Sequence, residues 1–193
     1  MTPQQQHQQL FDTLEILPQI TKGNSIIISN VPAIIERKVA TMRSNKNRYE
    51  EVSHRFVNPG LKWWLVALIH EMECTQNFNC YLGNGQPLNK KTTIVPAGRG
   101  PFATFADGAV DALKLQRADQ ITDWSLGNVL YFLEGYNGYG YSKYHNINSP
   151  YLWSGSNHYI SGKYVSDGNY DPDAVSSQIG IALLMKSLLQ QGA

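Results

Sequence analysis

The chain has 193 residues, of which 42% are hydrophobic and 16% are charged, and its formal net charge is +1. These values predict one compact domain with a sizeable core and exclude a disordered or collagen-like chain. Because the charge is balanced and no nucleic-acid-reading motif is present, nucleic acid is not expected as a partner.

Neither a membrane span nor a signal peptide is expected. The longest apolar run, residues 63–69, is far shorter than the roughly 20 residues that cross a bilayer. The Gln-rich residues 1–9 lack the positive and apolar regions of a signal peptide and are expected to be a frayed, low-complexity tail. The remaining domain, 10–193, divides into N-terminal helices over 10–56 and a core over 57–193.

Helices are predicted in the first half from capping residues and apolar spacing. After a helical turn or two near residue 10, Asn30 caps a second helix, and a third covers 45–56 until Asn58-Pro59-Gly60 ends it. From Leu61 to Cys74, apolar residues recur at i, i+3, i+4, i+7, i+8 and i+11, which predicts a helix with one stripe facing a core.

The second half alternates irregular segments with helices. Residues 79–103 are rich in glycine and proline, which predicts an extended surface segment, and long irregular segments in compact domains tend to be functional. Further helices are predicted after Thr104, after Thr122 or Asp123, and after Asp171-Pro172-Asp173. The fold is therefore predicted to be mainly α.

Two carboxylates, Glu71 and Glu73, lie at the end of the helix that is predicted up to Cys74. At about 100° per residue they point roughly 200° apart, so one of them is expected to face solvent. Glu73 follows the core residue Ile69 by four positions and lies beside the buried stripe. Partial desolvation there suits a carboxyl group to proton donation.

A Gly- and Tyr-rich segment, residues 133–141, follows another apolar helix. Its glycines let the backbone approach another group closely, and its tyrosines supply flat faces and hydroxyls of the kind that bind sugars. A helix C-cap followed by an aromatic loop is the structural alternative.

Motifs for metal, nucleotide and serine-hydrolase chemistry are incomplete. His70-Glu71-Met72-Glu73 begins like the helix of a zinc metalloprotease, but Cys74 stands where the second His ligand is required. The glycine spacings fit neither a dinucleotide fingerprint nor a phosphate-binding loop, so no metal or cofactor is expected. Cys74 and Cys80 are compatible with a local disulfide or with two free thiols.

Two segments taken together resemble a known group. Glu73 with Asn77-Phe78-Asn79, and later Glu134-Gly135-Tyr136-Asn137-Gly138, resemble the lytic transglycosylases and goose-type lysozymes. A closer resemblance is to a bacterial and phage family of lysozyme-like peptidoglycan hydrolases. It is carried, in one order, by residues 70–73, 77–79, 82–88, 95–98, 109–113, 136–141, 149–154 and 156–159.

The resemblance implies a single lysozyme-like domain, of the α+β lysozyme superfold, that acts on β-1,4 glycans of N-acetylated amino sugars. Glu73 matches the catalytic acid, and Tyr136 and Asn137 match the pair near it, with the tyrosine hydroxyl expected to hold the carboxyl group. The sequence departs from the family at Cys74, which replaces a serine, and by one extra residue before the Phe-Asn pair. Glu71 therefore stays the alternative acid.

Further site residues follow from these expectations. An inverting hydrolase needs a second carboxylate to activate water, for which Asp107 and Asp111 are candidates, whereas a transglycosylase needs none because the sugar's own hydroxyl attacks. The residues expected to bind the glycan are Asn84, Arg99, Tyr139, Tyr141, Tyr151, Trp153, Asn157 and His158.

Two rival functions remain open. Gly98-Arg99-Gly100-Pro101 resembles a fragment of the plant-type chitinase pattern, which favours a chitinase or chitosanase of the same superfold. The other rival is a non-catalytic glycan-binding or phage structural module. With no signal peptide, release through a holin or delivery on a particle is expected for action on the cell wall, with residence in the cytoplasm as the alternative.

Overall fold

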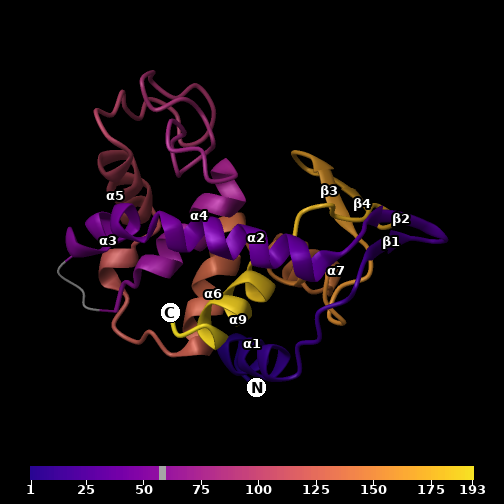
Figure 1. Ribbon diagram of the computed structural model, residues 1–193. Coiled ribbons are helices and arrows are strands. Elements are labelled where there is room, and N and C mark those ends of the chain that lie inside the picture. The colour runs from indigo at the N-terminus through magenta and orange to yellow at the C-terminus, as the bar shows by residue number, and fades with distance from the viewer. Residues whose placement is uncertain (57–59) are drawn as a thin grey trace. The chain divides into compact units, whose positions relative to one another are not determined.

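The computed structural model describes residues 1–56 and 60–193, and it is mainly helical, as predicted (Figure 1). The sequence predicted one domain over residues 10–193, whereas the chain divides into two compact units. Unit 1 comprises Met1–Val39 and Ser125–Ala193, and unit 2 comprises Ala40–Trp124. The predicted helix stop at Asn58-Pro59-Gly60 falls largely outside the described residues.

Unit 2 is built from helices. Helix α2 (Val31–Ser44) begins in unit 1 and ends in unit 2. The other helices of unit 2 are α3 (Lys46–His54), α4 (Trp63–Cys74), α5 (Phe105–Leu115) and the short 3-10 helix η1 (Ala118–Gln120). Helix α3 packs against both α4 and α5.

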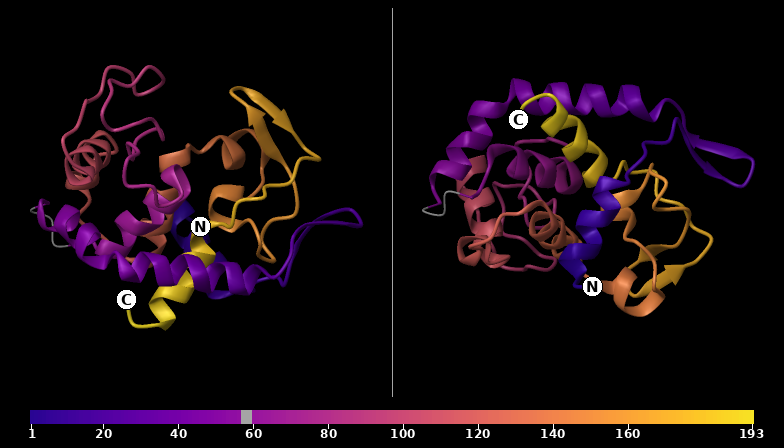
Figure 2. Two further views of the ribbon diagram at one scale, coloured as in Figure 1. Left: turned by 45° about the horizontal axis from the view of Figure 1, so that its top comes forward. Right: turned by 90° about the horizontal axis from the view of Figure 1, so that it is seen from below.

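Unit 1 combines helices with two small hairpins. Its helices are α1 (Pro3–Asp12), α6 (Leu126–Asn137), α7 (Gly140–His145), α8 (Pro150–Trp153) and α9 (Ile181–Gln190). Strands β1 (Ile20–Lys22) and β2 (Ser25–Ile28) pair antiparallel, as do β3 (Lys163–Ser166) and β4 (Asn169–Asp171). Figure 2 shows the β1–β2 hairpin projecting beyond the start of α2.

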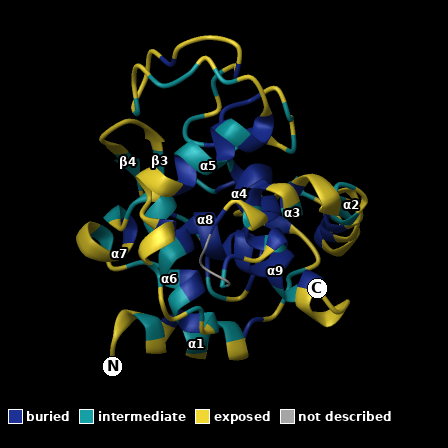
Figure 3. Cartoon of the chain, turned by 90° about the vertical axis from the view of Figure 1, so that its left-hand side faces the viewer, coloured by how far each residue is buried: buried dark blue, intermediate teal, exposed yellow. Residues whose placement is uncertain are grey.

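Helix α4 confirms the prediction for residues 61–74 but is buried on more than one stripe. Ten of its twelve residues are buried, because its sequence is apolar on every side (Figure 3). The helix ends at Thr75 and Gln76, which adopt left-handed backbone conformations with φ of 50° and 59°. Their N–H groups donate to the carbonyls of Glu71 and His70, which satisfies the last turn of the helix.

An aromatic cluster fastens α4 inside unit 2. The ring of His70 lies 4.6 Å from that of Phe78 and 4.4 Å from that of Phe105, centroid to centroid. The hydroxyl of Tyr49, on α3, lies 3.1 Å from Nδ1 of His70. This cluster joins α3, α4, α5 and the turn after α4.

The expected frayed tail at residues 1–9 is wrong, because Pro3–Asp12 forms α1 and docks on α6. Thr2 and Gln5 form a reciprocal capping box at its start. Gly127 permits the close approach of the two helices, since a Cβ atom there would lie 2.3 Å from the carbonyl oxygen of Gln4. Nε2 of His7 lies 2.7 Å from Oε2 of Glu134, with both side chains buried.

Two predicted helix starts lie later than expected. Helix α6 begins after Ser125 rather than after Thr122 or Asp123. Helix α9 begins after Gly180, because the Asp171-Pro172-Asp173 segment follows β4 instead of opening a helix. Among the described residues, no helix is both long and apolar enough to span a bilayer.

The buried imidazole of His70 generates a pH-dependent stability. Burial lowers its pKa from the ordinary value of 6.5 to about 4, so between these values the unfolded chain binds a proton that the folded protein does not. Stability therefore falls as the pH drops from 6.5 towards 4, by about 3 kcal/mol over the whole window.

Urea unfolding of the wild type and of His70→Gln at pH 7 and pH 5 measures this contribution. The variant is expected to be less stable at pH 7 but to lose less stability on acidification, since it has no imidazole at this position to protonate. An identical pH dependence in both proteins would contradict the assignment.

Candidate functional site

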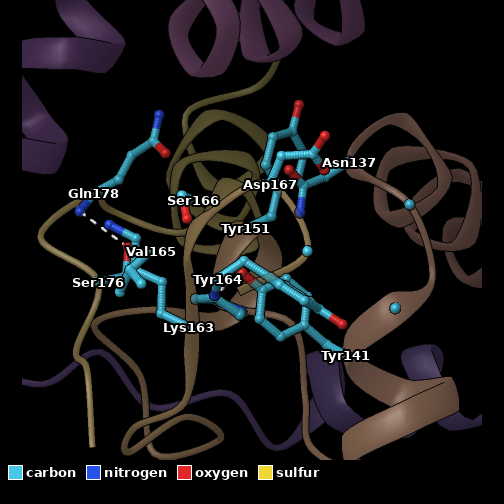
Figure 4. A pocket seen from close by; sticks show the side chains of 14 residues that line it. Asn137, Tyr141, Tyr151, Lys163, Tyr164, Val165, Ser166, Asp167, Ser176 and Gln178 are labelled. Atoms are coloured by element: carbon cyan, nitrogen blue, oxygen red, sulfur yellow. Dashed lines mark hydrogen bonds between the residues drawn. The ribbon is translucent and has the colours of Figure 1, made fainter. Parts of the chain in front are cut away.

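The candidate site in unit 1 is a cavity of about 570 Å³. Its walls come from the end of α6 and the start of α7, from α8, from residues 163–168 of the β3–β4 hairpin, and from Ser176 and Gln178 (Figure 4). Its volume lies within the range of about 300–1,000 Å³ that is typical of ligand pockets. Three residues that the sequence predicted for the site, Asn137, Tyr141 and Tyr151, lie on this wall.

Helix α6 delivers Asn137 to the cavity. Its apolar residues Val129, Leu130 and Leu133 are buried, which fixes the helix, and Gly138 ends it with φ of 87°. Asn137 is the last helical residue and is exposed. Tyr136 is half-buried, with its ring edge-on to that of Phe132 at 6.4 Å.

The β3–β4 hairpin is held over the cavity by an aromatic base. The N–H of Tyr164 donates to the hydroxyl of Tyr141 at 3.2 Å, and the hydroxyl of Tyr164 lies 2.9 Å from Nε2 of His145. The ring of Tyr170 stacks on His145 with centroids 3.5 Å apart. Burial raises the pKa of Tyr141 above its ordinary value.

Helix α8 places Tyr151 on the cavity wall and Trp153 in the core of unit 1. Ser149 caps the helix by accepting from the N–H of Tyr151 at 3.3 Å, and the ring of Tyr151 forms part of the cavity wall. Trp153 has no exposed surface, so its ring packs in the core of unit 1 rather than against a polymer.

The other predicted binding residues of unit 1 hold the backbone. Asn157 accepts from the N–H of Glu15 and donates to the carbonyl of Thr13, both at 3.0 Å. Nε2 of His158 lies 3.2 Å from the hydroxyl of Thr13. Tyr139 stacks on Tyr131 at 4.7 Å and lies at a separate cavity of about 170 Å³. These side chains secure the chain after α1 and the segment after α6.

In unit 2 the burial of the two carboxylates of α4 is the reverse of the prediction, which placed Glu73 beside the buried stripe. Glu71, not Glu73, is the enclosed one, with only 4% of its surface exposed. Oε2 of Glu71 accepts a hydrogen bond of 2.7 Å from the side-chain amide of Gln76. Glu73 is half-buried at the last turn. The reversal follows from the burial of α4 on all sides, which a single-stripe interpretation misses.

Asp111 braces the loop over residues 79–103 against α5. Its carboxylate accepts from the hydroxyl of Tyr81 at 2.7 Å and from Nε of Arg99 at 3.0 Å, and Nη2 of Arg99 binds the other oxygen. Burial opposes ionisation of Asp111, but the hydrogen bonds from Arg99 and Tyr81 outweigh it and lower its pKa. Asn84 donates to the carbonyl of Ile94 at 3.1 Å and so shapes the same loop.

Asp107 is occupied at the start of α5. It closes a capping box with Thr104, whose hydroxyl donates to it at 2.7 Å, and Nη1 of Arg55 lies 2.7 Å from its other oxygen. The hydrogen bond from Thr104, followed by that from Arg55, lowers the pKa of Asp107. Both proposed second carboxylates therefore have structural partners.

The cavity residues that were not predicted include Lys163, Tyr164, Asp167 and Gln178. A local signal for three of them was present, because Asp167-Gly168 between two short polar-aromatic runs is a typical two-residue hairpin turn. No group of three His, Cys, Asp or Glu side chains that could hold a metal ion occurs within residues 1–56 and 60–193.

Comparisons of this chain with protein-family models, with curated proteins and with solved structures find no match.

Cys74 and Cys80 form a disulfide in the structure, with Cα atoms 5.9 Å apart. It closes the turn that carries Asn77 and Phe78 directly after α4. Thiol titration of the denatured, unreduced protein should therefore detect no free thiol, and two free thiols would contradict the pairing.

Replacing both cysteines by alanine should lower the free energy of unfolding by about 2 kcal/mol, because the closed loop is short. Urea unfolding of the double variant measures this cost. Reducing the wild type should produce a similar loss, while reduction should leave the stability of the double variant unchanged.

Proposed function

We propose that the protein is a lysozyme-like enzyme that cleaves the β-1,4 linkages of peptidoglycan, with Glu73 as the general acid. The observation that carries the proposal is the cavity of unit 1, which combines tyrosines with neutral and charged hydrogen-bonding groups. The segments that resemble lysozyme-like hydrolases contribute Asn137, Tyr141 and Tyr151 to its wall.

The cavity has the chemistry that amino sugars require. A pyranose ring has an apolar face that packs on tyrosine, while its hydroxyl and acetamido groups need donors and acceptors. Tyr141, Tyr151 and Tyr164 supply aromatic surface, and Asn137, Ser166 and Gln178 supply polar groups.

The exposure of the two carboxylates favours Glu73 over Glu71. A general acid has to come within hydrogen-bonding distance of the glycosidic oxygen, which requires an accessible carboxyl group. Glu71 is enclosed and bound by Gln76, whereas Glu73 is partly exposed. We therefore assign Glu71 to the stability of α4 and Glu73 to catalysis.

Asp107 and Asp111 are held by hydrogen bonds and ion pairs to neighbouring side chains, so neither is free to activate water. This favours the lytic transglycosylase route over inverting hydrolysis. In that route Glu73 protonates the glycosidic oxygen as its bond to the anomeric carbon breaks. The ionised carboxylate then accepts the proton of the 6-hydroxyl of the same muramyl sugar, which closes a 1,6-anhydro ring. No second carboxylate and no water molecule are consumed.

The rival functions have less support. The motif that resembles the chitinase pattern contains Arg99, and this guanidinium is bound by Asp111 within the loop. A structural explanation therefore accounts for the arginine of the motif. A non-catalytic glycan-binding module would use the same cavity but would release no product.

Glu73→Gln should lower cleavage of purified sacculi by about 10²–10⁴-fold, because the amide keeps the volume of the side chain but cannot donate the proton. Glu71→Gln is the matched control on the same helix. It should keep its activity per folded molecule and lose about 1–3 kcal/mol of stability, since the buried hydrogen bond from Gln76 is weakened.

Release of soluble fragments and urea unfolding of both variants separate these roles. If Glu71→Gln is inactive and Glu73→Gln is active, the assignment of the acid is wrong. If both variants keep full activity, neither carboxylate is the acid.

A further inference from the structure

Among the described residues, Lys163 is the one lysine or arginine on the wall of the cavity in unit 1. It is half-buried at the start of β3, and Figure 4 shows its side chain among those that line the cavity. Asp171 lies opposite it in the hairpin register, but its carboxylate accepts the N–H of Asp173 at 2.8 Å. Within the described residues, Lys163 makes no ion pair of 4.0 Å or less.

The other charged residue of the wall, Asp167, lies at the tip of the same hairpin. Among the described residues, no ion pair of 4.0 Å or less joins Lys163 and Asp167. The cavity thus presents a cation at the base of the hairpin and a carboxylate at its tip. A half-buried lysine without an ion-pair partner is available for an anion on the ligand.

We propose that Lys163 binds a carboxylate on the muramyl side chain and thereby selects peptidoglycan over neutral chitin. This inference rests on the proposed function, because it assigns specificity to the same glycan site. In peptide-free strands the carboxylate belongs to the lactyl group, and in peptide-bearing strands it belongs to the stem peptide. Neutral N-acetylglucosamine oligomers have no group that matches the ammonium.

The test measures binding in the Glu73→Gln background, so that turnover does not consume the ligand. Calorimetry compares three soluble glycans of equal length: chitin oligomers, peptide-free muramyl glycan, and muramyl glycan with stem peptides. Lys163→Gln should lower the affinity for at least one acidic glycan about tenfold, which is the range of a charged hydrogen bond. Its affinity for the chitin oligomer should stay unchanged. Lys163→Arg should restore most of the binding.

Lys143→Gln is the matched control, since Lys143 lies on α7 outside the cavity wall and faces the ring of Tyr144. In the Glu73→Gln background, Lys143→Gln should bind all three glycans with unchanged affinity. The affinity of the parent for the acidic glycan should fall with added salt, and that of Lys163→Gln should depend less on salt.

The arms of the experiment identify the source of the carboxylate. A loss confined to the peptide-free glycan assigns the lactyl group, and a loss confined to the peptide-bearing glycan assigns the stem. Equal effects of Lys163→Gln on all three glycans, or no binding of any of them, would overturn the inference. Lys163-dependent binding without cleavage by the wild type would support it while overturning the proposed catalysis.

Discussion

The burial of α4 on every side is the constraint on which the arrangement of unit 2 depends. An apolar helix enclosed in this way can keep a polar side chain only where that side chain has a partner or lies at a helix end. His70 meets Tyr49 inside the aromatic cluster, Glu71 meets Gln76, and Glu73 lies at the last turn. The same burial that stabilises the helix thus confines its accessible carboxyl group to one end, where the disulfide fixes the turn that follows.

In unit 1, the β3–β4 hairpin needs packing partners, because a two-stranded hairpin is too small to be stable alone. Here its base is packed on His145 and Tyr141, while residues 163–168 remain available to form one wall of a cavity. The polar and charged groups of the hairpin can therefore face a ligand without being needed for the core. This division between an aromatic base and a polar wall is the physical basis on which we propose a glycan site.

The sequence predicts those features that depend on neighbours along the chain. The cap at Thr104 and the helices predicted over 45–56 and 61–74 are confirmed, with observed bounds of 46–54 and 63–74, because capping and apolar spacing are local signals. The docking of residues 3–12 and the burial of Glu71 depend on contacts distant in sequence, and the predictions for both were wrong. Among the predicted binding residues, Asn157 holds the backbone of Thr13, whereas the position of Lys163 on the cavity wall depends on packing that no local pattern indicates.

Mass spectrometry of the products that the purified protein releases from isolated sacculi is the decisive measurement for the proposed transglycosylase reaction. We expect soluble muropeptides that carry 1,6-anhydromuramyl ends, because the sugar's own hydroxyl replaces water as the nucleophile. Reducing ends would contradict this route and point to a hydrolase with a base not identified here. The absence of any released glycan fragment, with the protein folded and its disulfide intact, would contradict the assignment of glycan cleavage itself.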